Sequence, residues 1–447
     1  MRRSLIGAAS VALVVALGAC SSSSKGASGG TSAGTSASTA ATTPTASQSG
    51  GSTLAFSTTN QHDAHVNRSG QSILIGVEND DQGSFSFPTM HSAINAAMKN
   101  INANGGIDGA QLKEDFCSTD GTPESAINCA NRLVGDHVAL VTYGLEIAAA
   151  AQTPIFAGAG IPLIVNVNYD PKVSSDIWQT GPPISAYSLY QMLALKDLGS
   201  KHPGYLGTAD STHENQAKQM QAWGKIAGFD PVIAPFQNPA NADWSTAVQT
   251  AVSNGADSFN FGLVENACTS IVSAASQIGF KGPIDTTCSQ YLNTLPHSAT
   301  ANTYLSAQGY LPAADASAPP QIQRNMADYV KAMTAMGLAG QVNTAIEDQY
   351  STTEDIAALL RTIPAPQITP SAIKTALGVN QNLPGFDGPD FNCGAKVWPG
   401  NPQACYANVI VYKNTFQNGQ LVLVPILKTN NGFFYEPQYA AQSASVP

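Results

Sequence analysis

The sequence predicts an α/β fold built from doubly wound parallel sheets. Short apolar runs without polar alternation, such as Ile73–Val77, are typical of strands that are buried on both faces. Stretches with helical spacing of apolar residues alternate with these runs along most of the chain. Proline and glycine interrupt the alternation at Trp178–Pro183, and a chain of 447 residues is too long for one core. We therefore expect two α/β lobes.

The first unit of this pattern runs from Ser72 to Gly109. The apolar strand is followed by a polar loop, Glu78–Ser86, and then by a helix with an apolar face. Asn104-Gly105-Gly106 ends that helix, since glycine accepts the left-handed conformation of a helix end. In open α/β sheets, loops between a strand and its helix line the ligand crevice.

The remaining elements follow the same alternation. We expect helices over residues 125–135, 148–158, 185–198, 212–227, 243–254, 267–278, 322–337 and 345–361, and one more that Thr369 caps. We expect strands over residues 138–142, 161–165, 204–208, 231–236, 258–262 and 283–287. Residues 117–122 are interpreted as a loop, and residues 408–427 as a hairpin that turns at Asn418-Gly419.

The N-terminus has the features of an export signal. Arg2-Arg3 precede an apolar run, Leu5–Leu17, that is shorter than the ~20 residues a membrane-spanning helix needs. The run ends in Leu17-Gly18-Ala19-Cys20, which resembles a bacterial lipoprotein cleavage site, so we expect Cys20 to be lipidated. A plain secretory signal is the alternative. Residues 21–70, rich in Ser, Gly, Thr and Ala in their first part, are expected to form a disordered tether with an r.m.s. reach of about 40 Å.

Composition and cysteines narrow the class of protein further. Charged residues make up 11% of the chain and the net charge is −10, which argues against binding nucleic acid. Without Cys20, six cysteines remain, and fifteen pairings of them are possible in an exported chain. We expect sequence neighbours to pair, as Cys117–Cys129, Cys268–Cys288 and Cys393–Cys405. The alternative is a metal site, but the spacings lack the usual ligand pattern, so we expect no metal and no cofactor.

One phrase of the sequence resembles a known family. Ile-Asn-Ala-Asn-Gly-Gly-Ile-Asp-Gly, residues 101–109, is similar to a phrase near the start of bacterial solute-binding proteins of the leucine/isoleucine/valine type. Weaker similarity extends over roughly residues 71–427. The resemblance implies the type I periplasmic binding fold, with two lobes and a three-stranded hinge. It places chain crossings near 180–186, 309–314 and 383–389, lobe one at 71–183 and 313–384, and lobe two at 184–312 and 385–440.

The resemblance also implies where a ligand would bind, namely on loops at the carboxyl ends of strands in both lobes. Carried onto this sequence, the expected ligand-binding residues are Phe85, Tyr143, Glu146, Asn166, Asn168 and Tyr169 in lobe one, and Asp210, His213, Glu265, Ser289 and Tyr291 in lobe two. Aromatic rings would wall the site and a few polar groups would orient the ligand. An ordinary loop side chain is the alternative reading of each residue.

The loops depart from the small hydroxyl residues with which amino-acid binders of this family hold a carboxylate. Glu146 would repel a carboxylate in a partly dry cleft, and Asp210, Glu214 and Glu265 add negative charge in lobe two. We therefore expect a neutral or cationic ligand, amino-acid-like or an amide, with apolar or aromatic parts. The resemblance implies a protein on the outer face of the membrane that delivers this ligand to an ABC permease.

Two other functions fit parts of the sequence. The same fold serves in sensors that report ligand occupancy to a signalling partner, and the sequence does not separate the two roles. An acyl hydrolase is the third reading, since Ser371-x-x-Lys374, Tyr406-x-Asn408 and Lys428-Thr429-Asn430 follow the order of a serine acyl-transferase. The short gaps and the missing glycine argue against it. His213-Glu214 begins like a zinc motif but lacks the second histidine, so we expect no enzyme.

Overall fold

A computed structural model describes residues 54–57, 66–83, 86–168, 175–238, 241–261, 265–286, 292, 294–343, 345–426 and 432–447. The side chains of Glu265, Asn266 and Asp315 are outside this description. Cys20 and the expected tether up to residue 53 also lie outside it.

The first sheet holds five parallel strands in the order β2-β1-β3-β4-β5. Its strands are β1 (Ser72–Asp80), β2 (Gln111–Thr119), β3 (Leu140–Tyr143), β4 (Leu163–Val165) and β5 (Ile177–Gln179). The chain moves outward from β1 to β2 and then crosses back to β3, so the strand order reverses between β1 and β3. A ligand crevice in such a sheet lies at this reversal, outside the carboxyl ends of the strands.

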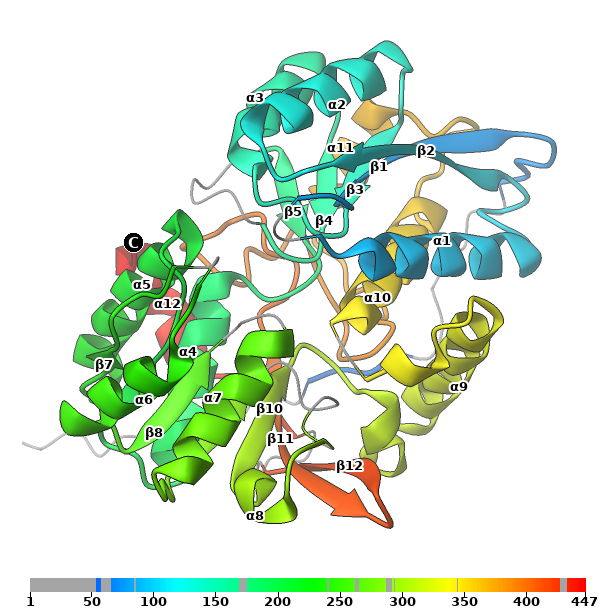
Figure 1. Cartoon of the computed structure of the whole chain (residues 1–447). Helices are drawn as coiled ribbons and strands as arrows, with labels where there is room; N and C mark the ends of the chain where they lie inside the picture. The colour runs from blue at the N-terminus through cyan, green and yellow to red at the C-terminus, as the bar shows by residue number, and fades with distance from the viewer. Residues whose placement is uncertain are drawn as a thin grey trace, which may run out of the picture. The chain divides into compact units, whose positions relative to one another are not determined.

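Helices cover both faces of this sheet (Figure 1). On one face lie α1 (Pro88–Ala103), α10 (Ile346–Arg361) and α11 (Pro370–Leu377), which share a core with Ile73, Ile75 and Val77 of β1. On the other face lie α2 (Pro123–Gly135) and α3 (Ala149–Ala159), packed on Val141 and Leu163. The expected doubly wound α/β architecture is confirmed.

The second sheet repeats this topology and then extends it. Its parallel part has the order β7-β6-β8-β9-β10, and antiparallel β11 and β12 continue it beyond β10. Its strands are β6 (Pro203–Tyr205), β7 (Val232–Ile233), β8 (Ser258–Phe261), β9 (Ile284–Thr286), β10 (Thr303–Ala307), β11 (Val409–Gln417), β12 (Gln420–Pro425) and β13 (Phe433–Phe434). The strand order here reverses between β6 and β8.

The second sheet is also covered on both faces. One face carries α4 (Ile184–Asp197), α5 (Ser211–Ala227) and α12 (Pro437–Gln442), and the other carries α6 (Trp244–Ser253) and α7 (Glu265–Gln277). The short helix α8 (His297–Thr300) precedes β10, and the last turn of the chain is η4 (Ser443–Ser445).

The segment after β10 packs against both halves of the molecule. It comprises η2 (Pro312–Ser317), α9 (Pro320–Ala335) and η3 (Ala339–Gln341). Met326 and Met333 of α9 share one core cluster with Ala93 of α1 and with Ile410 and Tyr412 of β11. The expected lobe boundary near residue 313 therefore falls in a segment that has contacts on both sides, and the exact boundaries stay a prediction.

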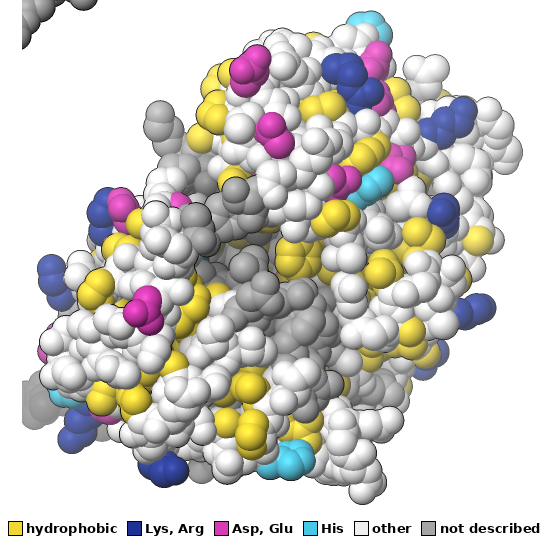
Figure 2. All heavy atoms as spheres, in the orientation of Figure 1, with side chains coloured by type: hydrophobic (Ala, Val, Ile, Leu, Met, Phe, Trp, Pro, Cys, Tyr) yellow, Lys and Arg dark blue, Asp and Glu magenta, His cyan; other side chains and the backbone are white. Residues whose placement is uncertain are grey.

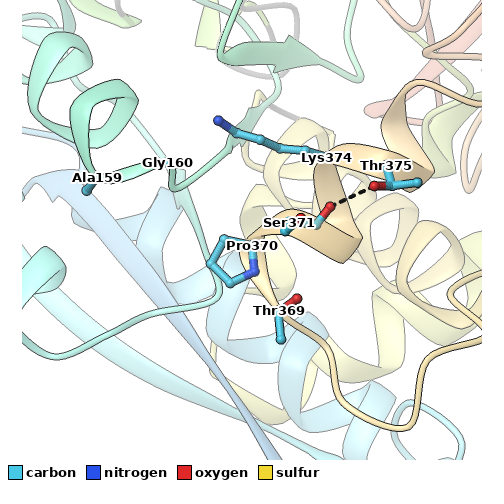
Figure 3. Close-up of a pocket in the computed structure, with 7 residues that line it drawn as sticks. All are labelled: Ala159, Gly160, Thr369, Pro370, Ser371, Lys374 and Thr375. Atoms are coloured by element: carbon cyan, nitrogen blue, oxygen red, sulfur yellow. Dashed lines mark hydrogen bonds between the residues drawn. The ribbon is translucent and has the colours of Figure 1, made fainter.

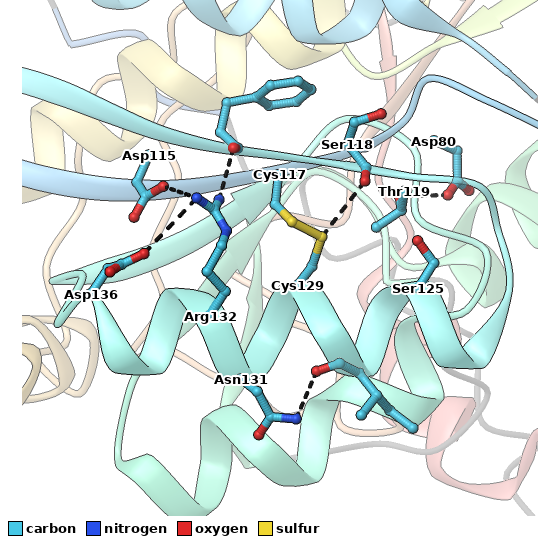
Figure 4. Close-up of a disulfide and its surroundings, with 12 residues drawn as sticks. Asp80, Asp115, Cys117, Ser118, Thr119, Ser125, Cys129, Asn131, Arg132 and Asp136 are labelled. Atoms are coloured by element: carbon cyan, nitrogen blue, oxygen red, sulfur yellow. Dashed lines mark hydrogen bonds and ion pairs between the residues drawn. A yellow bond between two sulfur atoms is a disulfide. The ribbon is translucent and has the colours of Figure 1, made fainter.

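Two of the three expected disulfides are present. Cys117 is bonded to Cys129, which ties β2 to α2 (Figure 4), and Cys393 is bonded to Cys405. Arg132 of α2 reinforces the first tie through an ion pair of 2.9 Å with Asp115 of β2. Cys288 lies outside the described residues, so the Cys268–Cys288 pairing stays a prediction.

Three strands differ from the sequence-based expectation. Residues 117–119, expected in a loop, form the end of β2, whose polar sequence gives no strand signal because β2 is an edge strand. The short strands β5 and β10 were not expected either. In contrast, the hairpin of β11 and β12 turns at Asn418 and Gly419, both of which have positive φ as a type I′ turn requires.

Candidate functional site

The carboxyl ends of β1, β3 and β4 bring together part of the expected lobe-one site. Tyr143 is the last residue of β3 and is buried, and its hydroxyl lies 3.5 Å from the side-chain oxygen of Asn168 beyond β4. Asn168 also donates its backbone N–H to the side-chain oxygen of Gln179, at 3.0 Å. Tyr143 and Asn168 are therefore neighbours, and β5 helps to fix the position of Asn168.

Asn166 is held by groups from distant parts of the chain. Its side-chain amide donates to the side-chain oxygen of Gln308, at 2.5 Å, and to the hydroxyl of Thr352, at 3.3 Å. Gln308 directly follows β10 of the second sheet, and Thr352 lies in α10, which packs on the first sheet. In this structure the Asn166 amide group thus connects elements of both sheets, which is a structural role.

Glu146 is buried at the carboxyl edge of the first sheet. One carboxylate oxygen accepts a hydrogen bond from the backbone N–H of Ala148, at 2.9 Å, and the other has no hydrogen-bond partner among the described residues. Burial, and next the nearby negative charge of Asp80, raise the pKa of Glu146 to about 7. Near neutral pH this carboxyl group is therefore partly protonated, so it repels an anionic ligand less than a fully ionised group would.

Asp210 and His213 form a compact pair at the start of α5 in the second sheet. Asp210 caps the helix by accepting the backbone N–H of His213, at 3.0 Å, and its second oxygen lies 2.6 Å from the Nδ1 atom of His213. Thr208 donates its hydroxyl to the same oxygen, at 2.5 Å. Burial alone would raise the pKa of Asp210, but the bonds from His213 and Thr208 and the charge of His213 lower it to about 2. Asp210 therefore stays ionised near neutral pH, and its charge is paired with His213.

The other expected ligand-binding side chains are outside the described part of the structure. These are Phe85 and Tyr169 in lobe one, and Glu265, Ser289 and Tyr291 in lobe two. They remain predictions, together with any contact that they make to a ligand.

A buried polar network that no sequence motif indicates lies where the chain passes between the sheets. Ser351 of α10 donates to Asp387, at 2.9 Å, and the backbone N–H of Tyr310 donates to the backbone carbonyl of Asp387, at 2.7 Å. The Tyr406 hydroxyl donates to the carbonyl of Gln308, at 2.9 Å. Residues 308–310 and Asp387 lie at or beside the chain crossings expected at 309–314 and 383–389. Apart from these expected crossings, nothing in the sequence pointed to them.

The residues of the acyl-hydrolase reading do not form a catalytic group in the described structure. Ser371 and Lys374 line a pocket of about 660 Å³ between the end of α3 and the start of α11 (Figure 3). Lys374 extends away from Ser371 and forms an ion pair of 2.7 Å with Asp176. Tyr406 is buried and bonded to Gln308, and residues 428–430 lie outside the description. No proton acceptor is therefore placed beside Ser371 by these residues.

The surface agrees with the low charge content of the sequence. On the face shown in Figure 2, Lys and Arg side chains are scattered, and some of them lie beside acidic side chains. This face offers no basic stripe of the kind that phosphate backbones require.

Comparison with known proteins identifies a family and a set of similar folds. The family model described as "Periplasmic binding protein" matches residues 72–415. Among curated proteins, none matches the sequence. All the similar solved structures named below are less than 25% identical to this chain, so they establish the fold alone.

Three solved structures represent these folds. A fatty acid ABC transporter substrate-binding protein from Thermomonospora curvata has a TM-score of 0.69 at 15% identity, over 84% of this chain and 95% of that one. A solute-binding protein from R. palustris in complex with 4-hydroxybenzoate has a TM-score of 0.63 at 15% identity, over 82% and 98%. The branched-chain amino acid binding protein LivJ from Streptococcus pneumoniae, in complex with isoleucine, has a TM-score of 0.59 at 17% identity, over 79% and 99%.

Proposed function

Because the chain belongs to the periplasmic binding protein family, we propose that it captures a small molecule outside the cytoplasm and delivers it to an ABC importer. The match over residues 72–415 is the observation that carries this proposal. Ligand capture would proceed by hinge closure, in which a solute that touches both lobes favours the closed form through its differential contacts. No residue needs to form or break a covalent bond for this role.

The arrangement of the two sheets supports a site between the lobes. Each sheet reverses its strand order once. The expected residues lie at strands next to these reversals, since Tyr143 is the last residue of β3 and Asp210 follows β6. We place the lobes at residues 71–183 with 313–384 and at 184–312 with 385–440. The packing of α10 and α11 on the first sheet supports the return of the chain to lobe one.

We further propose a neutral or cationic ligand with an apolar or aromatic part. Asp210 supports this class, because it stays ionised and a ligand that displaces His213 would meet its negative charge. Glu146 supports it less strongly, since its pKa is about 7. The neighbours named above bind isoleucine and 4-hydroxybenzoate, and these ligands belong to those proteins.

Two measurements test capture and ligand class separately. Native mass spectrometry of the purified protein should reveal a co-purified solute, and small-angle scattering should show compaction when that solute is added back. Replacing Tyr143 by Phe should weaken binding, whereas the same change at Tyr439 on α12 should not. Absence of compaction with every bound solute would contradict hinge closure. Tight binding of leucine would contradict the ligand class alone.

Lipid anchoring is proposed on the sequence of the cleavage site, residues 17–20. None of the helices within the described ranges combines the length and the apolarity that crossing a bilayer requires. Growth with an alkyne-bearing fatty acid should label the protein, and replacing Cys20 by Ala should abolish the label. Labelling that survives this replacement would contradict the assignment of Cys20.

A further inference from the structure

Three carboxylates meet at the start of α10. Glu347 and Asp348 are in the first turn of this helix, and Asp387 comes from the segment that follows α11. One carboxylate oxygen from each residue lies within 4.8 Å of the other two. Glu347 and Asp387 are buried and Asp348 is half-buried, so solvent reaches the group only at Asp348.

The surroundings of Glu347 do not neutralise this group. The Glu347 side chain is 0% exposed, and neither of its carboxylate oxygens receives a hydrogen bond from a donor group among the described residues. One oxygen of Asp387 likewise has no donor, while the other accepts from Ser351. None of the ion pairs formed within the described part of the chain involves these three acids.

The charges of this group also act on a phenol in the second half of the molecule. The charges of Asp348, Asp387, Asp285 and Glu347 all raise the pKa of Tyr187, after burial as the largest cause. Tyr187 lies in α4 and Asp285 in β9 of the second sheet. One oxygen of Asp285 is also buried without a hydrogen-bond partner in the described structure. Tyr187 thus lies within range of charges from both halves of the molecule.

Helix geometry explains only part of this arrangement. Acidic residues in a first turn interact favourably with the helix dipole, typically by 0.3–1 kcal/mol, and Glu347 and Asp348 occupy that turn. Removing a carboxylate from water without a partner costs several kcal/mol. The dipole is too weak to offset that for two adjacent acids and a third that faces them, so either protons or a bound cation must neutralise the group.

We propose that Glu347, Asp348 and Asp387 bind one hard divalent metal cation, with Ca²⁺ as the best fit. Two oxygens on opposite sides of a Ca²⁺ ion are separated by about 4.8 Å, since Ca–O distances are about 2.4 Å. Three oxygens within 4.8 Å of one another lie no more than about 2.8 Å from a common point, so a small inward movement of the side chains brings all three into the Ca–O range of about 2.3–2.6 Å. Oxygen-only ligands are the set that hard cations prefer, and water completes the coordination on the open side at Asp348.

The cation would connect α10 to the last chain crossing. Asp387 is already bonded to Tyr310, which follows β10, so the ion would lie among segments that run between the two sheets. This metal site goes beyond the proposed capture of a solute and does not depend on it, because metal binding is measured without any solute.

Calorimetric titration of the chelator-treated, full-length protein with CaCl₂ tests the site. We expect one ion per chain with a Kd below about 1 mM, the weak limit for extracellular calcium modules. Replacing Glu347 by Gln should weaken the affinity by at least about tenfold, since even removal of groups outside the ligand shell costs 10–100-fold. Replacing Asp328 by Asn, an exposed acid on α9, is the matched control and should change nothing.

A second variant keeps the test decisive if the buried substitution impairs folding. Asp348 is half-buried, so Asp348→Asn should fold normally by circular dichroism and still lose at least about tenfold in Ca²⁺ affinity. The proposal is overturned if CaCl₂, MgCl₂ and MnCl₂ all fail to bind at millimolar concentration. It is also overturned if both variants bind Ca²⁺ as tightly as the natural protein, and protons then neutralise the three acids instead.

Discussion

The buried Arg68 offers a quantitative test of how the first sheet is held. Its side chain is 0% exposed and forms an ion pair with Asp108, which is 27% exposed. The same guanidinium donates to the carbonyls of Ile363 and, at 2.8 Å, Ala365. Arg68 therefore joins the segment before β1, the turn before β2 and the link between α10 and α11.

Replacing Arg68 by Met should lower the free energy of unfolding by about 3 kcal/mol. Breaking a buried ion pair from one side typically costs 3–5 kcal/mol. The value should lie at the low end, because the exposed part of Asp108 can be hydrated after its partner is lost. The two carbonyls of residues 363 and 365 lose their donor, which accounts for most of the effect at about 1–3 kcal/mol each.

Replacing Asp108 by Asn should cost less, about 1 kcal/mol, because the asparagine oxygen still accepts from the charged guanidinium, which also keeps its bonds to the carbonyls of residues 363 and 365. The backbone at Asp108 has a φ of 52°, which asparagine tolerates, so strain does not obscure the comparison. Urea denaturation followed by circular dichroism measures both changes. Arg324→Met is the control, since Arg324 is exposed and should alter stability by less than about 0.5 kcal/mol. A loss below 1 kcal/mol for the Arg68 variant, or a larger loss for Asp108→Asn, would refute the reasoning.

Three further predictions concern the disulfides, the pH response and the crossings. Replacing the Cys117–Cys129 pair by serines should lower the free energy of unfolding by about 3 kcal/mol, because the unfolded chain gains entropy. Replacing the Cys393–Cys405 pair should have the same effect, because both disulfides span 12 residues. Clearly unequal urea midpoints for the two variants would contradict this. Glu146 has a raised pKa, so the folded state binds its proton more tightly than the unfolded state, and stability falls as pH rises from about 4.5 to 7. The Glu146→Gln variant should lack this part of the fall, and parallel stability curves from pH 4 to 8 would disprove it. Gly309→Ala should lower the stability of the protein by roughly 1–3 kcal/mol, because the new Cβ would lie 2.1 Å from a buried carboxylate oxygen of Asp387. Gly158→Ala on α3 is the control, since a Cβ there meets free space and should not lower stability. Equal melting temperatures for these two variants would argue against the crowding at Gly309.

The sequence predicted the long apolar strand at the centre of the first sheet and the capped helix α11, but not the short buried strands β5 and β10. The run Ile73–Val77 becomes the central strand β1, which has neighbours on both sides, so every position there needs an apolar residue or a paired polar one. The capped start of α11 was also predicted, and Thr369 accepts the backbone N–H of Ala372 as expected. In contrast, β2 reads Gln-Leu-Lys-Glu-Asp-Phe-Cys-Ser-Thr and alternates only weakly, because one of its edges has no partner strand in the described structure.

The candidate site was predictable only as far as it follows strand ends. Tyr143 and Asn168 follow adjacent parallel strands, so their proximity is a consequence of the sheet. The acids at the start of α10 are different, because Asp387 is distant in sequence from Glu347 and Asp348 and meets them only through the return of the chain after α11. No local pattern in the sequence encodes that meeting.

The bond between the Tyr310 amide and the Asp387 carbonyl has a consequence for motion. Together with the bonds from Ser351 to Asp387 and from Tyr406 to Gln308, it fastens neighbouring connecting segments side by side. Segments joined by these hydrogen bonds can bend together about an axis that crosses them. Sliding of one segment past another would instead break all of these hydrogen bonds. The hinge closure proposed above should therefore follow a single angular coordinate, with little shear.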